Sequence, residues 1–481
     1  MHQAIIIGTG FSGICMGIKL KEAGIHDFII LEKASEVGGT WRENTYPGAE
    51  CDIPSALYSY SFEHYPFWEY KWSHQPQILS YLKHCAEKYG LNPHIRFNQE
   101  MIAARFDEEN ACWYVQTKQG DEYQAQSLIS AVGQLHYPST PYMKGKELFK
   151  GDIWHSANWN HDISLESKKV GVVGNAASAV QFIPQIAPVV EKLTVFQRSA
   201  NWMIPKPDRP YKKWEKKLSA RIPFLLRLYR QSLWLKGGVM FLLMGKNKFF
   251  KKLGEAYSKN YIKRSVKDPE LRKKLMPDYP IGAKRILFSD DYYLTFNREN
   301  VELIDTPIQE MTESGIRLKE GKEIPLDVVI FATGFKTNPF LMGLDIEGLK
   351  GQKICEAWKE GAEAYLGITT SGFPNFFMMY GPNTNLGHNS IVIMSECQAK
   401  YITQCIVAWQ KNKFKYLNLK PEVQQKYNEK IQKRLANSAW DQIADSWYKS
   451  GNKITNNWPG RTMEYDWKTR KVKFSVFEMV K

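Results

Sequence analysis

The chain has 481 residues, 43% of them hydrophobic and 24% charged, which suits two or three folded domains of ~100–200 residues and argues against disorder. Its net charge of +15 raises nucleic acid or anionic lipid as partners, but no zinc-finger spacing or RNA-binding motif accompanies the charge. We therefore expect no nucleic-acid role, because much of the charge falls between Pro205 and Arg285 and marks one subdomain.

The cysteines and the apolar runs bear on where the protein works. Seven cysteines are scattered without a C-x-x-C pair, which favours a reduced, cytoplasmic protein. The first residues lead directly into a strand, without the basic and apolar regions of a signal peptide. The most apolar segment, Ile222 to Met244, is interrupted by Arg227, Arg230 and Lys236. A span needs ~20 apolar residues, so we predict no transmembrane helix.

The N-terminal third begins with a β-α-β unit. Ala4–Ile7 is a short apolar run typical of a buried parallel strand, Phe11–Ala23 has a helical pattern, and Phe28–Leu31 is a second strand. Gln75–Lys88 is predicted to be helical, and Ala111–Ser130 alternates like a pair of strands.

A second β-α-β unit follows a segment rich in Pro, Gly, Trp and His, residues 137–161, which we interpret as a linker. The unit comprises a strand over Val170–Val173, a helix over Ser178–Ile186 and a strand over Leu193–Phe196. Two such units without a repeat period indicate two nucleotide-binding folds rather than a solenoid.

The remaining chain divides into an insertion and two returning parts. Residues 211–275 are helical, basic and aromatic, and their composition also resembles that of interfacial helices, so peripheral membrane contact is one expectation. The alternative is an ordinary helical subdomain. Strands are expected at Val301–Ile304 and Val328–Phe331. We predict an α/β protein with two Rossmann-like dinucleotide-binding domains, one over 1–138 and 337–481 and the other over 139–210 and 281–336, with a helical insertion over 211–280.

The first nucleotide motif is a complete G-x-G-x-x-G between a strand and a helix, with Gly8, Gly10 and Gly13 at its glycine positions and Phe11 and Ser12 between the last two. Its glycines permit a tight turn, close approach of the backbone to pyrophosphate, and close packing of helix on strand. Glu32, 24 residues after Gly8, ends the second strand and can bind ribose hydroxyls.

The second motif starts at Gly174 and continues with Asn175, Ala176, Ala177, Ser178 and Ala179. Alanine replaces the middle and last glycines, and the middle replacement adds a methyl group where the backbone approaches phosphate. Arg198 lies 24 residues after Gly174, in the slot that Glu32 occupies in the first fold. An acid there suits FAD and a base suits the 2′-phosphate of NADPH. We therefore predict that 1–138 and 337–481 form the FAD-binding domain, and that 139–210 and 281–336 form the NADPH-binding domain. Alternatively, Arg198 is a solvated residue at a strand end.

Two further segments resemble the signature of the Baeyer–Villiger monooxygenases. One is Gly38-Gly39-Thr40-Trp41 followed by Tyr46-Pro47-Gly48 and Asp52; the other is Phe149-x-Gly151-x-x-x-His155-x-x-x-Trp159. Asn160 departs from the Pro or Asp of the family pattern. By residue type alone, Trp41 and Trp159 would be core residues and His155 a hydrogen-bonded linker residue. The resemblance implies that His155 and Trp159 couple two domains, not that His155 is a base.

The resemblance also implies roles for individual residues. Arg285 would be the active-site arginine, Asp52 the carboxylate that pairs with it beside the flavin, and Lys284 a partner of the NADPH phosphate. By residue type alone, Lys284 and Arg285 would be a pair in a basic stretch. The remaining residues that the resemblance assigns to the flavin site are Lys33, Gly39, Thr40, Trp41, Asn44, Tyr58, Met101 and Gln134.

The implied activity uses FAD, NADPH and molecular oxygen to convert a ketone into an ester or lactone through a flavin peroxide. Two alternatives stay open: a flavin-containing monooxygenase that oxidises amines or sulfides, and a basic membrane-surface protein with a vestigial flavin fold. The ten histidines form no H-E-x-x-H, so we expect no metal site, and the serine-hydrolase motif G-x-S-x-G is absent.

Overall fold

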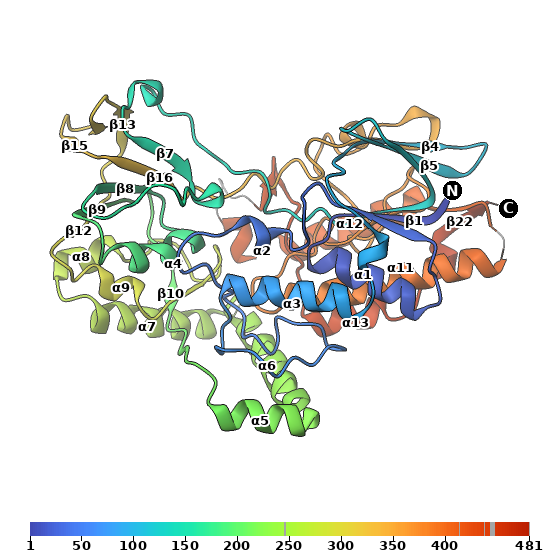
Figure 1. Cartoon of the computed structure of the whole chain (residues 1–481), viewed down its shortest axis with the longest axis horizontal. Coiled ribbons are helices and arrows are strands. Elements are labelled where there is room, and N and C mark those ends of the chain that lie inside the picture. Colours follow the sequence, from blue (N-terminus) through green and yellow to red (C-terminus); the bar gives the residue numbers. More distant parts are fainter. Residues whose placement is uncertain (245–246, 413, 437, 443–447, 481) are drawn as a thin grey trace.

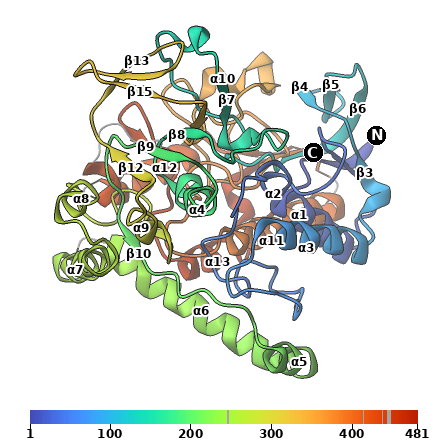
Figure 2. The same ribbon diagram turned by 60° about the vertical axis from the view of Figure 1, so that its left-hand side comes forward.

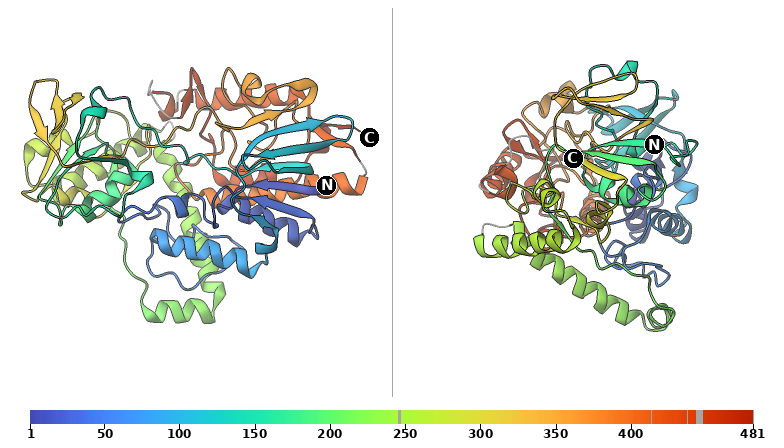
Figure 3. Two further views of the ribbon diagram at one scale, coloured as in Figure 1. Left: turned by 45° about the horizontal axis from the view of Figure 1, so that its top comes forward. Right: turned by 90° about the vertical axis from the view of Figure 1, so that its left-hand side faces the viewer.

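Two sheets with their covering helices lie at opposite ends of the molecule, and both chain termini lie beside the first sheet (Figures 1 and 3). This arrangement comes from a computed structural model that describes residues 1–481 except 245–246, 413, 437, 443–447 and 481. The expected α/β class is confirmed, with a mixed, mainly parallel sheet in one half and a wholly parallel sheet in the other.

The first sheet is built from both ends of the chain. Its order is β17-β4-β5-β6-β1-β2-β3, with β18 also paired to β6. The strands are β1 His2–Ile7, β2 Phe28–Leu31, β3 Ile95–Arg96, β4 Met101–Asp107, β5 Cys112–Thr117, β6 Glu122–Ser130, β17 Asp345–Glu347 and β18 Phe376–Met378. Helix α1 (Phe11–Glu22) packs against α11 (Ile391–Asn412) and α3 (Gln75–Lys88). The apolar residues of β1 and β2 are buried because helices and loops cover both faces.

The second sheet is wholly parallel, with the order β12-β9-β8-β16-β7. Its strands are β7 Asp152–His155, β8 Lys169–Val173, β9 Lys192–Phe196, β12 Val301–Ile304 and β16 Val328–Phe331. Helices α4 (Ala177–Ile186) and α9 (Tyr292–Thr295) pack together beside it. The interpretation of 137–161 wholly as linker was wrong, because β7 pairs in register with β16, Asp152 opposite Val328.

Smaller elements complete the two halves. They are α2 Thr40–Glu43, β10 Met203–Ile204, β11 Leu287–Phe288, β13 Ile308–Met311, β14 Gly315–Leu318, β15 Glu323–Pro325, α10 Ile354–Ala357, β19 Tyr416–Leu419, α12 Pro421–Leu435, β20 Lys449–Ser450, β21 Lys453–Ile454, α13 Thr462–Thr469 and β22 Phe477–Val480. Strands β13 to β15 form an antiparallel sheet, and β19 pairs with β22.

The helical insertion comprises α5 Lys213–Arg221, α6 Pro223–Met244, α7 Lys248–Ser265 and α8 Pro269–Lys274. The expected helical character of this segment is confirmed. Helices α5, α6 and α7 lie along one edge of the molecule (Figure 2). Among the described residues, no helix is long and apolar enough to cross a membrane.

Candidate active site

The first glycine turn connects β1 to α1. Gly8 has a φ of +100°, and a β-carbon there would lie 2.9 Å from the Ala131 carbonyl oxygen. A β-carbon on Gly13 would lie only 1.8 Å from the carbonyl oxygen of Gly8, whereas one on Gly10 would meet only Gly39 Cα, at 3.8 Å. Gly8 and Gly13 are therefore required by the protein's own packing, while Gly10 leaves space beside the start of α1.

Glu32 is held rigidly at the end of β2. One carboxylate oxygen accepts hydrogen bonds from the Thr9 backbone N–H, at 2.9 Å, and hydroxyl, at 2.5 Å, and the other accepts from the Ala34 N–H at 2.9 Å. Since an ionised carboxylate has about four acceptor positions and three are used, one remains for a further hydroxyl group. The Ser12 hydroxyl does not contact Glu32, because its Oγ lies 3.0 Å from Ser395 Oγ.

Aromatic and polar residues gather beside this turn. Trp41 Nε1 donates to the Tyr58 hydroxyl at 3.1 Å, and the Tyr58 ring packs edge-on against Phe11 at 4.8 Å. Burial raises the pKa of Tyr58, so its hydroxyl stays protonated. Asn44 Nδ2 donates to the carbonyl oxygen of Thr40, whose side chain is exposed. Gly39, with a φ of +52°, lies against Gly10.

Three other residues expected at the flavin site each have surroundings of a different kind. Gln134 donates from Nε2 to the Tyr380 carbonyl oxygen at 3.2 Å, and its buried Oε1 has no hydrogen-bond partner in the described part of the chain. Met101 is buried at the start of β4. Lys33 is exposed, 3.5 Å from the Glu43 carboxylate. Gln134 thus has an acceptor still to be satisfied by a ligand or water.

The second turn connects β8 to α4 and repeats the geometry of the first. Gly174 has a φ of +111°, and a β-carbon there would lie 2.5 Å from the Ala332 carbonyl oxygen. Ala176 is the N-cap of α4, and Asn175 Nδ2 donates to the Ser199 carbonyl oxygen at 2.9 Å. Ser178 lies in the first turn of α4, beside the Tyr46 hydroxyl.

Two cations lie beside each other beyond the end of β9. Lys284 Nζ donates to Ser199 Oγ at 2.9 Å and lies 4.5 Å from the centre of the Tyr279 ring. Burial, and then the charge of Arg198, lower the pKa of Lys284. Arg198 is exposed and makes no hydrogen bond or ion pair with the residues that the structure describes. Two cations that repel each other beside a hydroxyl group form a site suited to an anion.

Arg285 and Asp52 form a bidentate pair between the two halves of the molecule. Arg285 Nε donates to Asp52 Oδ2 at 2.8 Å, and Nη2 donates to Oδ1 at 2.7 Å. The Asp52 carboxylate raises the pKa of Arg285, so the guanidinium is charged at any working pH. The side chain of Arg285 is 37% exposed and that of Asp52 is 19% exposed, so the pair is still partly accessible to a ligand.

Two tyrosines near Arg285 are not evident from the sequence. Tyr380 and Tyr448 both lie near the guanidinium and add to the rise of its pKa. Tyr380 has a φ of +61°, unusual for a tyrosine, and its hydroxyl donates to Asn385 Oδ1 at 2.8 Å. The only local signal is its position immediately before Gly381-Pro382-Asn383.

His155 has a structural environment. It is buried, its Nδ1 accepts a hydrogen bond from the Ala157 N–H at 3.1 Å, and its ring meets that of Phe335 edge-on. Burial lowers its pKa. Trp159 is partly buried against Phe182. Both residues pack within the second half, and His155 lies on β7.

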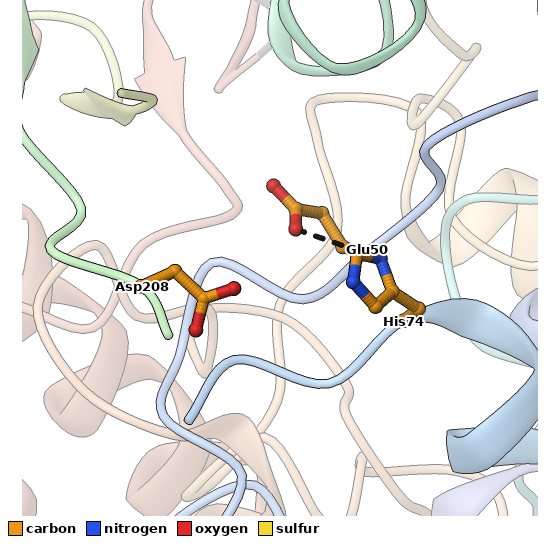
Figure 4. A group of neighbouring side chains, drawn as sticks. All are labelled: Glu50, His74 and Asp208. Atoms are coloured by element: carbon orange, nitrogen blue, oxygen red, sulfur yellow. Dashed lines mark ion pairs between the residues drawn. The ribbon is translucent and has the colours of Figure 1, made fainter. Parts of the chain in front are cut away.

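Glu50, His74 and Asp208 come close enough to one another to suggest a metal site (Figure 4). The buried ammonium group of Lys206 forms an ion pair with Glu50, and Asp208 Oδ1 accepts from the backbone N–H groups of Trp72 and Arg209. Burial and the nearby Lys206 lower the pKa of His74. Because Lys206 supplies the positive charge, we interpret the group as a link between segments and propose no metal there.

Comparison with known proteins places the chain in a family. Residues 5–218 match the model of the pyridine nucleotide-disulphide oxidoreductases. A Baeyer–Villiger monooxygenase of Pseudomonas aeruginosa is 40% identical over 99% of this chain and 91% of that protein. The chain belongs to the Baeyer–Villiger monooxygenases. It is therefore an FAD- and NADPH-dependent monooxygenase, and the amine or sulfide alternative is not supported.

Solved structures extend this Baeyer–Villiger likeness to the whole fold. A steroid monooxygenase bound to NADP has a TM-score of 0.91 and 31% identity, covering 100% of this chain and 99% of that one. A complex of OTEMO with FAD and NADP has a TM-score of 0.88 and 30% identity, again covering 100% and 99%.

Proposed function

We propose that this Baeyer–Villiger monooxygenase inserts one oxygen atom of O2 into a ketone at the Arg285–Asp52 pair. The observation that carries the assignment is the bidentate contact between these residues, one from each half of the molecule. Product analysis with linear, cyclic and aryl ketones tests it: an ester or lactone supports the proposal, and exclusive oxidation of amines or sulfides contradicts it.

The proposed FAD site has features that fit the cofactor. The turn at Gly10 leaves room for pyrophosphate beside the N-terminus of α1, and Glu32 retains one acceptor position for a ribose hydroxyl. Gln134 Oε1 is a buried acceptor without a partner among the described residues. The other residues that we assign to this site are Gly8, Phe11, Ser12, Gly13, Lys33, Gly39, Thr40, Trp41, Asn44, Asp52, Tyr58 and Met101.

The proposed NADPH site lies at the second turn. Gly174, Asn175, Ala176 and Ser178 would bind the pyrophosphate, and Arg198 and Lys284 would bind the 2′-phosphate together with the Ser199 hydroxyl. Support comes from the position of the two cations, which lack an acidic partner at hydrogen-bonding distance in the described chain. The methyl group of Ala176 fits because it lies at an exposed N-cap.

Arg285 supplies a fixed positive charge where the ketone reacts. When bound, the cofactors supply the redox chemistry that activates oxygen. As a ketone carbonyl is attacked, negative charge grows on its oxygen, and a preorganised donor there contributes roughly 3–4 kcal/mol. Asp52 holds the planar guanidinium in one orientation through two parallel hydrogen bonds. Tyr58 and Trp41, both partly buried, limit access of water nearby.

The cellular setting is also proposed. The seven cysteines are free, which supports a reducing compartment such as the cytoplasm. Peripheral contact with a membrane through residues 211–275 is the second part of this proposal, and the side chains of the helical insertion support it.

A further inference from the structure

Exposed apolar side chains are concentrated on the helical insertion. Of the 22 large hydrophobic residues that are exposed in the described part of the chain, eleven lie between Trp214 and Tyr257. Single exposed hydrophobic residues are ordinary, but a concentration of them marks a surface for interaction. This segment is therefore the strongest candidate for an interaction surface on the molecule.

These side chains follow the helical period, so they form stripes. On α7, Phe249, Leu253 and Tyr257 are four residues apart and are 70%, 58% and 55% exposed. On α6, Phe224 and Leu228 repeat the same spacing, at 62% and 50% exposure. Residues four apart lie on one face of a helix. Each of these helices therefore presents an apolar stripe to its surroundings.

The opposite face of α6 is fastened to the rest of the protein. Arg230 Nη1 donates to the carbonyl oxygens of Ala56 and Leu57, at 2.9 and 3.1 Å, and Trp234 Nε1 donates to Thr462 Oγ1 at 3.0 Å. These bonds fix the rotation of the helix about its axis. The apolar stripe on its outer face cannot turn inward without breaking them, and a helix that is apolar on both faces requires two apolar environments.

The charged residues of the same segment are almost all positive. Residues 211–265 contain fifteen Lys and Arg against two Asp and Glu, so they carry nearly all of the net charge of +15. Among the described residues, Arg230 is the only one of these cations in an ion pair, with Glu396 at 3.9 Å. The other described cations of this segment therefore have no acidic partner at ion-pair distance and can meet an anionic surface.

We propose that α5, α6 and the first half of α7 form a surface that docks on an anionic phospholipid bilayer. Lys and Arg interspersed with Trp, Phe and Leu on exposed helices match an interfacial arrangement, in which apolar side chains enter the bilayer and cations meet its headgroups. The three helices lie along one edge of the molecule (Figures 2 and 3), so they can meet a plane together.

Two other kinds of binding partner fit this helical surface less well. A nucleic acid would satisfy the cations but would leave the apolar stripes in water. A second copy of the chain, docked symmetrically, would bring two segments of the same strong positive charge together. The bilayer satisfies both the stripes and the cations. The docking proposal specifies the surface and the lipid of the proposed peripheral membrane contact. It is independent of the catalytic assignment.

The test uses the FAD-loaded protein and vesicles made of phosphatidylcholine and phosphatidylglycerol in equal parts. Cosedimentation is expected at low salt, with at least about tenfold weaker binding to vesicles of phosphatidylcholine alone. Trp214→Ser, Phe224→Ser and Phe249→Ser combined should weaken binding at least about tenfold. The matched control, Tyr142→Ser with Met479→Ser, removes exposed apolar residues elsewhere and should bind like the wild type.

Three results would overturn the proposal. They are absence of cosedimentation at low salt, equal binding by the triple variant and the wild type, and a concentration-dependent dimer that the triple variant abolishes. Flavin absorbance and ketone turnover without vesicles are measured in parallel, so a failed catalytic assignment is recognised separately. If the triple variant loses flavin, Lys213→Glu with Lys217→Glu and Lys248→Glu replaces it, and the same loss of binding is expected.

Discussion

Gly8 and Gly174 occupy equivalent positions in the two halves of the molecule. Each has a positive φ, and each lies directly against the carbonyl oxygen of an alanine that follows a returning strand, Ala131 for Gly8 and Ala332 for Gly174. A side chain at either position would collide with that backbone. The same turn is therefore built twice, and the residues around it distinguish the two nucleotide sites.

Gly10 offers the cleanest test of the first turn, because a side chain there meets only Gly39 within the protein. Gly10→Leu should leave the fold intact and abolish the flavin absorbance of the purified protein by filling the pyrophosphate position. Gly238→Ala, at a position with open space around it and no positive φ, serves as the control and should retain flavin. An unchanged flavin spectrum in Gly10→Leu would remove the assignment of FAD to this turn.

Local patterns predicted the two β-α-β units and the helical insertion, because each signal lies within a short stretch of sequence. They failed at β7, since Asp-Ile-Trp-His has no strand pattern and Asp152 is paired with Val328, far along the chain. Tyr380 and Tyr448 were missed for the same reason: loops distant in sequence bring them to Arg285. The residues of the Arg285–Asp52 pair came from family resemblance, and their contact from the structure.

Arg198→Ala should raise the KM for NADPH about tenfold and scarcely change the KM for NADH. A charge-assisted contact is worth about 1.5–3 kcal/mol, and the exposed position of Arg198 favours the lower end of this range because solvent screens the charge. Lys284→Ala should also raise the KM for NADPH and scarcely change the KM for NADH. Steady-state kinetics with both cofactors give the answer, and equal losses with NADPH and NADH would show a structural role instead.

His388 makes stability depend on pH. It is buried, neither ring nitrogen has a hydrogen-bond partner among the described residues, and burial lowers its pKa to about 4. Because the folded pKa lies below the unfolded one, the neutral ring stabilises the fold fully above about pH 6.5. That stabilisation, roughly 3 kcal/mol, is lost as the pH falls from about 6.5 to 4.

Replacement of His388 by Gln should therefore flatten the loss of unfolding free energy in acid. Denaturant unfolding at pH 7.5 and 5 measures this, and His26→Gln, at an exposed histidine, is the control. A wild-type pH dependence in the His388→Gln protein would show that this ring does not titrate as described.

Asp52→Asn should leave flavin content near wild type and slow ester formation about 10- to 100-fold. Asparagine retains one acceptor for Arg285 but loses the charge and one of the two hydrogen bonds, so the guanidinium is no longer fixed in orientation, and small misplacements of a catalytic group have effects of about this size. Ester formation by chromatography and flavin content by absorbance are the measurements. Unaltered ester formation would mean that Asp52 does not position Arg285.

The most direct test of the central claim is the ester formed per NADPH consumed by the Arg285→Ala protein. The first glycine turn should still bind FAD, and NADPH should still be oxidised, though more slowly if the arginine also positions the nicotinamide. Without the fixed cation, ester formation should fall by about 100-fold or more, and the consumed NADPH should appear as hydrogen peroxide. Arg285→Lys should recover little, because a point charge cannot form the bidentate contact with Asp52. A ratio of ester to NADPH far below the wild-type value is the predicted result; a ratio equal to the wild-type value would contradict the assignment of Arg285 as the catalytic arginine.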